Sequence, residues 1–355
     1  MASGTGQRFF LYCLVMLAFI GAVSSTANFT ILGKIPNAAN EALNNLFSNS
    51  STGRVRRAPD ILEYFPSYDQ IINWMEDLDR KYGGAVVVEN VATTAEGRQI
   101  KAIIINFTNS WKTVFIVATL HARDWGSTAA ALHVINELTN NAVSYPKLQF
   151  RFIIIPVANP DGYVYSWERD RFWRKNRARQ WQGTVGVDLN RNFGYKWHKV
   201  YHIAETEPAE ETYRGPTAFS EVESKIIKKA MLWLRQWLVL FVDLHSPGQT
   251  ILYPWGFTKR PAREENQLRA VAAAAAEAIK NEAGTTYQYG SLSELQGSVG
   301  GTALDYCHAI DVNACFGLEV GAEVHMETVE IPQLGTEAMA AIASMALNAV
   351  KYKDS

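Results

Sequence analysis

The sequence lacks the features that define several classes of protein. Its 355 residues include only 3 cysteines, which excludes a small scaffold held together by disulfides. The 34 lysines and arginines nearly balance the 35 aspartates and glutamates, so the net charge of −1 argues against nucleic acid or an anionic membrane surface as the main partner. Beyond Val23, no apolar run is long enough to span a membrane. A hydrophobic content of 48% excludes a disordered chain and permits a sizeable core.

The N-terminus is typical of targeting and processing segments. Arg8 precedes an apolar run, Phe9 to Val23, which ends in small residues. We therefore predict a secretory signal peptide at residues 1–25, with an uncleaved membrane anchor as the alternative. Residues 26–57 form a polar segment that ends in Arg-Val-Arg-Arg, either a proprotein-convertase site or a basic linker. We expect a secreted, extracellular protein whose mature domain covers residues 58–355.

The glycosylation sequons and the cysteines are compatible with passage through the secretory pathway. Asn28, Asn49 and Asn106 each begin an Asn-X-Ser/Thr sequon, which is compatible with glycosylation in the secretory pathway. Cys307 and Cys315 flank a predicted turn. In an oxidising compartment they could form a hairpin disulfide, or they could remain as reduced buried thiols.

The remainder of the chain alternates between helical periodicity and strand-like apolar runs. Apolar residues recur at helical spacing between Ile61 and Tyr82, and the run from Thr113 to Leu120 is typical of a strand buried on both faces. Further strands are predicted at 85–91, 99–107, 150–157, 238–244, 250–253 and 314–320, and further helices at 127–139, 221–235, 264–282 and 334–350. We therefore predict an α/β fold: a single domain in which helices flank a mixed, mostly buried sheet, with ligands at the carboxyl ends of the strands.

Two predicted strands end in residues that can bind a metal ion. His121 and Asp124 follow the strand that ends at Leu120, and His245 follows the strand at 238–244. Two histidines and one carboxylate, supplied from strand ends, are the ligand set of an open tetrahedral zinc site that keeps a position for water. We therefore predict one Zn²⁺ per chain.

Arginines, amides and one unusual carboxylate accompany the predicted metal site. Segments 171–174 (RFWR) and 186–193 (GVDLNRNF) place arginines and amides among aromatic residues. Such groups suit the binding of a carboxylate and the stabilisation of an oxyanion, although a solvated basic loop is the alternative. Glu319 interrupts an apolar strand. Because a buried carboxylate is costly, Glu319 is either a general base or half of a structural ion pair.

The order and spacing of these motifs resemble the zinc metallocarboxypeptidases of the pancreatic carboxypeptidase A/B family, also called funnelins. The resemblance extends from about Tyr64 to Tyr352. Further matching segments are 213–216 (YRGP), 220–223 (SEVE), 252–256 (LYPWG) and 289–291 (YGS). The resemblance implies a carboxypeptidase that cleaves the C-terminal peptide bond of peptide or protein substrates with a free C-terminus. We expect the protein to be a monomer.

The resemblance also implies roles for the residues around the metal. His121, Asp124 and His245 would ligate the zinc ion. Asp188 would orient the ring of His121 through a hydrogen bond. Arg174 would stabilise the oxyanion of the tetrahedral intermediate.

For the substrate, the resemblance implies a second set of roles. Asn190 and Arg191 would hold the C-terminal carboxylate of the peptide, which restricts cleavage to the chain end. Glu319 would take a proton from the attacking water and return it to the leaving amine. Arg123 and Ser246 would line the groove for the upstream residues of the peptide.

Specificity follows from one further position. Asp305 and Glu319 are 14 residues apart, which is the interval of the family motif. Leu304 is then at the floor of the specificity pocket, where members specific for basic residues carry aspartate. An apolar floor favours an apolar or aromatic C-terminal residue and leaves a basic one unpaired.

Two positions depart from the family pattern. The family ligand is glutamate, whereas Asp124 is shorter by one methylene, or roughly 1.3 Å of reach. The tyrosine that covers bound substrate in the family is missing from residues 295–298. The alternative function is therefore a catalytically impaired homologue that binds peptide C-termini or a protein partner.

Overall fold

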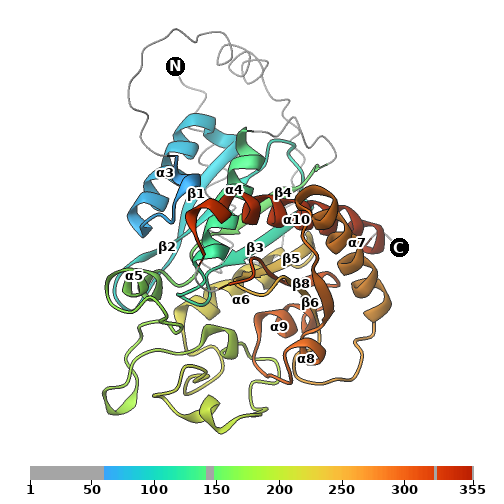
Figure 1. Cartoon of the computed structure of the whole chain (residues 1–355). Helices are drawn as coiled ribbons and strands as arrows, with labels where there is room; N and C mark the ends of the chain where they lie inside the picture. The colour runs from blue at the N-terminus through green and yellow to red at the C-terminus, as the bar shows by residue number, and fades with distance from the viewer. Residues whose placement is uncertain (1–59, 141–147, 324–325, 354–355) are drawn as a thin grey trace, which may run out of the picture.

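The computed structural model describes residues 60–140, 148–323 and 326–353, so the predicted signal peptide and pro-segment lie outside the described residues. Eight strands form one mixed sheet in the order β1-β2-β4-β3-β5-β8-β6-β7 (Figure 1). The strands are β1 Val86–Thr93, β2 Gln99–Ile105, β3 Thr113–Ala118, β4 Arg151–Ile155, β5 Leu238–His245, β6 Thr250–Tyr253, β7 Gln288–Ser291 and β8 Cys315–Glu319. The predicted α/β fold with a mixed, mostly buried sheet is confirmed.

Helices cover both faces of the sheet (Figure 1). One face packs against α3 (Tyr68–Tyr82), α4 (Trp125–Asn140), α7 (Glu265–Ala283) and α10 (Ile331–Lys353). The other face packs against α6 (Val222–Leu234) and α9 (Ala303–Ala309). The remaining helices are the short α5 (Pro160–Glu168) and α8 (Leu292–Leu295).

The apolar run of β3 is explained by these two layers. Successive strand side chains point to opposite faces. Val114 and Ile116 enter the core with α4 and α10, whereas Phe115 and Val117 enter the core with α6. All six residues of β3 are buried, so a polar residue at any of them would lose hydration on either side.

Local sequence signals explain several differences from the predicted elements. The helix predicted from Ile61 to Tyr82 is divided, because Ser67 caps α3 and forms a capping box with Gln70. The helix α5, which the sequence analysis did not predict, begins with Pro160 at its first position, and the side chain of Asn159 accepts from the amide of Gly162.

The two described cysteines are bonded. Cys307 and Cys315 form a disulfide with a Cα–Cα distance of 6.1 Å. Cys307 belongs to α9 and Cys315 begins β8, so the bond joins a helix to a strand. A disulfide was one of the two predicted states, but the expectation of a hairpin was wrong, because the chain before the turn is helical.

The topology brings three strand ends together. In the parallel part of the sheet, β5 lies between β3 and β8, so the carboxyl ends of the three strands meet at one edge. His245 at the end of β5 pairs in register with Glu319 at the end of β8. The predicted metal and general-base residues therefore share one edge of the sheet.

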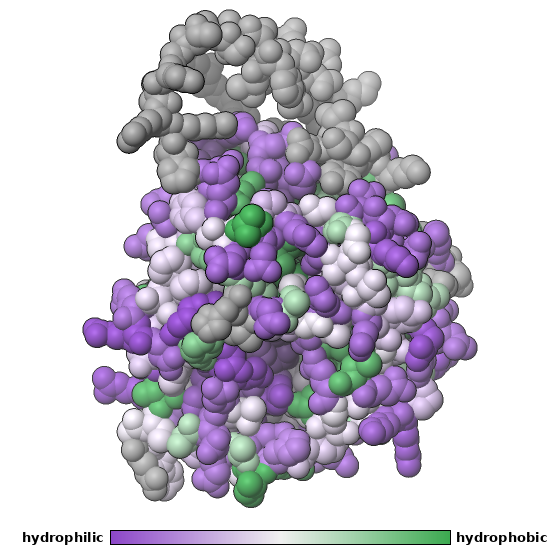
Figure 2. Space-filling view, in the orientation of Figure 1, coloured by the Kyte–Doolittle hydropathy of each residue, from purple (hydrophilic) through white to green (hydrophobic). Residues whose placement is uncertain are grey.

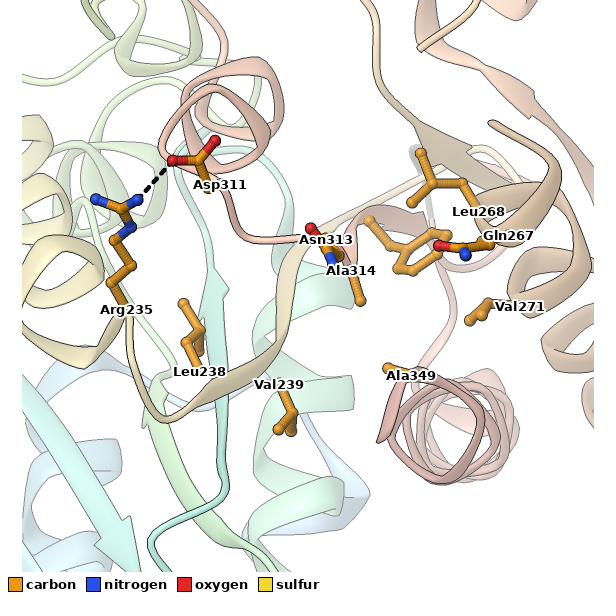
Figure 3. Close-up of a pocket in the computed structure, with 11 residues that line it drawn as sticks. Arg235, Leu238, Val239, Gln267, Leu268, Val271, Asp311, Asn313, Ala314 and Ala349 are labelled. Carbon is orange, nitrogen blue, oxygen red and sulfur yellow. Dashed lines mark hydrogen bonds and ion pairs between the residues drawn. The ribbon is translucent and has the colours of Figure 1, made fainter. Parts of the chain in front are cut away.

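A small cavity lies at the end of β5 that is opposite His245 (Figure 3). It encloses about 60 Å³ between Leu238 and the helices α7 and α10, and an ion pair of 2.5 Å joins Arg235 to Asp311 at its side. With a rise of about 3.3 Å per residue, the eight residues of β5 separate it from His245 by more than about 20 Å. Its lining is mainly apolar, and its carboxylate, Asp311, is paired with Arg235.

The face of the molecule seen in Figure 2 is mostly hydrophilic. On the visible face, hydrophobic residues form small separate patches among hydrophilic ones (Figure 2). Among the helices of the described ranges, none has the length and apolar character needed to cross a bilayer.

Candidate active site

The metal-ligand candidates come from two turns at the sheet edge. Beyond the end of β3, Thr119 adopts a positive φ of 60°. Its hydroxyl donates to Pro156 O at 3.0 Å and therefore accepts from the hydroxyl of Thr128 at 2.6 Å. This turn brings His121 back over the strand ends and places Asp124 immediately before α4. His245 is the last residue of β5.

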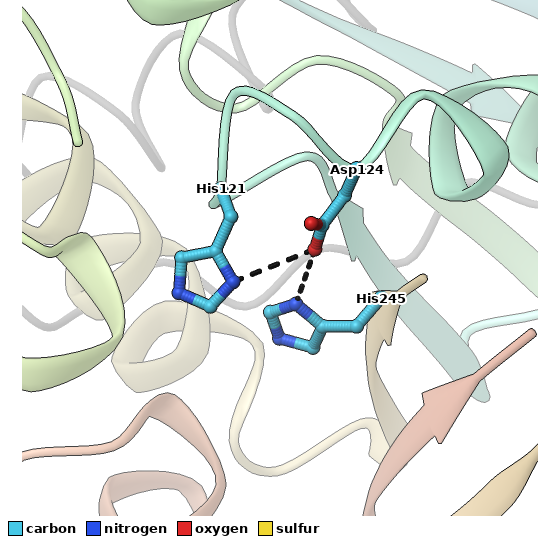
Figure 4. Close-up of side chains that lie close together, drawn as sticks. All are labelled: His121, Asp124 and His245. Carbon is cyan, nitrogen blue, oxygen red and sulfur yellow. Dashed lines mark hydrogen bonds and ion pairs between the residues drawn. The ribbon is translucent and has the colours of Figure 1, made fainter. Parts of the chain in front are cut away.

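The three side chains converge (Figure 4). Asp124 Oδ2 lies 2.9 Å from His245 Nδ1 and 3.4 Å from His121 Nδ1, and one ligand atom from each residue lies within 4.8 Å of the others. An ion about 2.0–2.1 Å from each atom in a tetrahedron would hold neighbouring ligand atoms about 3.3 Å apart. The donor set and its spacing therefore fit zinc, and the shorter aspartate still reaches the site.

Asp188 lies behind His121. Its Oδ1 is 3.1 Å from His121 Nε2, and its Oδ2 accepts a 2.9 Å hydrogen bond from Arg174 Nε. Burial alone would raise the pKa of Asp188, but the guanidinium groups of Arg174 and Arg191 hold that pKa well below its usual range. A permanently ionised Asp188 keeps a proton on Nε2 of His121 and leaves Nδ1 free to bind a metal.

Asn190 and Arg191 follow in a short 3₁₀ helix, Leu189–Arg191, that Asp188 caps through the amide of Asn190. The amide oxygen of Asn190 accepts from the backbone of Ala303 at 2.9 Å, which fixes the orientation of the side chain. Arg191 lies with one nitrogen 3.9 Å from Asp188. The predicted carboxylate-binding pair thus lies beside the metal-ligand candidates.

Glu319 faces the same space and is only half-buried, because it ends β8 instead of interrupting it. Thr250 Oγ1 donates to Glu319 Oε2 at 2.7 Å, and Gln296 Nε2 lies 2.7 Å from both carboxylate oxygens. Among the described side chains it forms no ion pair with a lysine or arginine, so the structural alternative has no support there. Gly248 makes room for it, since a Cβ there would lie 2.2 Å from Oε2.

The three metal-ligand candidates, together with Arg174, Asn190, Arg191 and Glu319, line one cavity of about 450 Å³. Its apolar wall is formed by Leu252, Leu292, Val299 and Leu304, and Leu304 is 2% exposed. Ser246 also lines the cavity, although its hydroxyl accepts from the amide of Ser127 at 3.1 Å.

Arg123 lies at the rim of this cavity. Its guanidinium donates to Glu211 at 3.2 Å and to the carbonyl of Phe172 at 3.3 Å. Phe172 itself is 42% exposed. The rim therefore combines a cation with an aromatic surface, which suits an extended peptide.

Asp243 and Gln296 are among the residues of this cavity that were not predicted from the sequence. Asp243 Oδ2 lies 3.0 Å from His245 Nε2 and accepts from Asn190 Nδ2 at 2.9 Å. The available signal was the same as for Glu319, a single carboxylate within an apolar strand. Gln296 carried no comparable signal, because its contact with Glu319 depends on how a loop folds over β8.

Comparisons with known proteins agree with this geometry. The family model for zinc carboxypeptidases matches residues 71–341. Carboxypeptidase B of Astacus astacus is 32% identical over 64% of this chain and 76% of its own length. An inactive metallocarboxypeptidase of Saccharomyces cerevisiae is 31% identical over 71% of this chain and 62% of its own length.

A solved structure agrees in fold. The crystal structure of carboxypeptidase A from Helicoverpa armigera superposes with a TM-score of 0.77 at 28% identity, covering 89% of this chain and 81% of that one. The cofactor of the matched family is zinc, for which His121, Asp124 and His245 form a metal-binding triad, and the enzyme class is metallocarboxypeptidase. The chain belongs to the zinc carboxypeptidase family.

Proposed function

We propose that this chain is a secreted carboxypeptidase that hydrolyses the C-terminal peptide bond of peptides and proteins and prefers an apolar or aromatic C-terminal residue. The observation that carries the proposal is the shared cavity: the metal triad, Glu319, Arg174, Asn190 and Arg191 all line the same 450 Å³ space. A peptide bond next to the triad would have a base, an oxyanion partner and a carboxylate-binding pair within reach.

Each residue has a distinct role in the proposed reaction. Zinc held by the triad would polarise the scissile carbonyl and lower the pKa of a bound water to about 7. Glu319 accepts the proton of the attacking water and delivers it to the leaving amine. Arg174, held by Asp188 at 2.9 Å, stabilises the negative charge that develops on the carbonyl oxygen.

The substrate is positioned by its free end. Asn190 and Arg191 bind the terminal carboxylate, because an amide N–H and a guanidinium both donate to it. An internal peptide bond lacks that carboxylate, so cleavage is confined to the chain end. The apolar wall around Leu304 takes the C-terminal side chain and leaves the charge of a lysine or arginine without a partner.

A second candidate is an impaired homologue that binds C-termini without cleaving them. The hydrogen bonds from Gln296 and Thr250 to the carboxylate of Glu319 favour it, because they occupy oxygens that would otherwise face an attacking water. Asp124 in place of glutamate and the absence of the capping tyrosine favour it too. A relative from Saccharomyces cerevisiae is named an inactive metallocarboxypeptidase, which is compatible with loss of activity in this family.

The decisive experiment measures zinc content and hydrolysis together. The purified chain is expected to bind one zinc ion and to hydrolyse a blocked dipeptide ending in phenylalanine faster than one ending in arginine. Chelation should abolish turnover, and added zinc should restore it. The control Glu319→Gln should keep the zinc and lose turnover by about 100-fold or more.

Two outcomes would contradict the proposal. One equivalent of zinc without turnover, combined with measurable binding of a peptide C-terminus, would establish the second candidate. Faster release of arginine than of phenylalanine would leave the enzyme but reverse the specificity.

A further inference from the structure

We propose that Asp243 is a positioning residue that fixes the zinc ligand His245 and the carboxylate-binding Asn190 relative to one another. This inference rests on the proposed function, which assigns those roles to the two residues. One oxygen of Asp243 is the point at which the metal site and the substrate site are joined.

The first contact follows from strand geometry. Asp243 and His245 are two apart on β5, so their side chains point to the same face. Asp243 Oδ2 lies 3.0 Å from His245 Nε2. The ring nitrogen that faces Asp124 is Nδ1, so a proton on Nε2 that is bonded to Asp243 fixes the tautomer and the tilt of the ring.

His121 has the same arrangement on the other side of the triad. Asp188 holds its Nε2, and Asp124 faces its Nδ1. Each candidate zinc histidine therefore carries a carboxylate on the ring nitrogen that points away from the triad. Such partners hold the ring in place, and their removal typically lowers metal affinity by about 10–100-fold.

The second contact orients Asn190. Its amide nitrogen donates to Asp243 Oδ2 at 2.9 Å, while its amide oxygen accepts from Ala303 N at 2.9 Å. The same nitrogen lies 3.1 Å from His245 Nε2, which in the proposed tautomer carries a proton of its own and cannot accept. Of the two amide hydrogens, one is therefore bound to Asp243 and the other is available to a substrate carboxylate. With both ends held, the direction of that second N–H is fixed before substrate binds.

The charge of Asp243 is otherwise unexplained. Asp243 is 2% exposed, and its Oδ1 has no hydrogen-bond partner within the described residues. Asp188 is compensated by Arg174, whereas no lysine or arginine of the described ranges forms an ion pair with Asp243. Because an uncompensated buried carboxylate is costly, a role in holding a metal ligand accounts for its presence.

The test compares three variants. Asp243→Ser removes the carboxylate and leaves a polar group too short to bridge both partners. Asp243→Asn keeps an oxygen that can accept from both His245 and Asn190. Glu337→Gln is the control, because Glu337 is also a buried carboxylate (1% exposed) but accepts from Tyr287 beside α10.

Two measurements separate positioning from a general loss of structure. In chelator competition with zinc alone, Asp243→Ser should weaken binding by about 10-fold or more, whereas the asparagine variant and the control should stay close to the native value. Native enzyme should also prefer a substrate with a free C-terminal carboxylate over its C-terminal amide. Asp243→Ser should reduce that preference through a higher KM for the acid, with kcat less affected.

Some results would overturn the proposal. Unchanged zinc affinity in Asp243→Ser, or equal losses for the serine and asparagine variants, would show that the hydrogen bonds of Asp243 position nothing. An unchanged preference for the acid over the amide would remove the link to Asn190. If the serine variant fails to fold, the asparagine variant still decides, because a 10-fold loss of zinc affinity there contradicts positioning by an acceptor.

Failure of the proposed function would look different. A native chain that binds zinc without turnover would leave the zinc titration valid, and binding of peptide acid and amide would replace the kinetic comparison. Only a native chain that binds no zinc would remove both proposals together.

Discussion

Replacing Asp124 with the longer glutamate tests whether the native aspartate suits the zinc site or impairs the enzyme. In the native site, Asp124 Oδ2 is 2.9 Å from His245 Nδ1 and 3.4 Å from His121 Nδ1. These separations are already close to the roughly 3.3 Å edge of a tetrahedral zinc site. Asp124→Glu adds a methylene between the backbone and the carboxylate, so the ligand oxygen would lie roughly 1.3 Å beyond the position that matches that edge.

The expected size of the effect follows from that geometry. A misplacement of about 1 Å in an active site lowers the rate by about 100-fold, and one extra methylene moves the carboxylate by about that distance. We therefore expect Asp124→Glu to lower kcat/KM by about 100-fold and to weaken zinc binding more modestly. Asp124→Ala removes a ligand altogether. If about 10–16 kcal/mol of zinc binding is shared by four ligands, that loss is roughly 100-fold to 1,000-fold in affinity.

The assay combines zinc affinity, measured by chelator competition, with kcat/KM at saturating zinc. Asp124→Asn is the matched control, because it keeps the length of the side chain and removes its charge. An increase in kcat/KM in Asp124→Glu would refute the reasoning. It would show that the backbone suits glutamate and that the native aspartate impairs the enzyme.

Three further predictions concern specificity and stability. Leu304→Asp should change the preference between substrates ending in arginine and phenylalanine by about 100-fold or more in favour of arginine, and an unchanged ratio of kcat/KM would exclude Leu304 from the pocket floor. Burial and the nearby Glu221 raise the pKa of Glu223 to about 8 from its ordinary 4.5. The folded chain therefore holds a proton that the unfolded chain releases, so the free energy of unfolding should fall as pH rises from about 5 to 8, and Glu223→Gln should remove this decline in urea denaturation. Replacing both Cys307 and Cys315 with alanine should lower the free energy of unfolding by about 2–3 kcal/mol, and an equal urea midpoint would show that the disulfide contributes nothing.

The residues at strand ends could be predicted from the sequence because their signal is local. His121 and His245 each follow a run of apolar residues long enough to be a buried strand. Parallel strands bring their carboxyl ends to one edge, so convergence of the two histidines was a physical expectation. The structure places both within contact of Asp124.

The contacts that depend on packing between distant segments could not be predicted in this way. The amide of Asn190 is held by Ala303, 113 residues further along the chain. Gln296 reaches Glu319 because the loop after α8 folds over the end of β8. No periodicity or spacing in the sequence encodes either contact, because each depends on the path of a loop.

The pairing of β3 with β5 makes the metal site a reporter of correct strand alignment. Ala118 pairs with Leu244; His245 follows Leu244 directly, and His121 lies three residues beyond Ala118. A slip of one residue would turn every side chain of one strand to the opposite face and would separate the imidazoles. Zinc binding would therefore report that the central strands β3 and β5 have reached their native alignment.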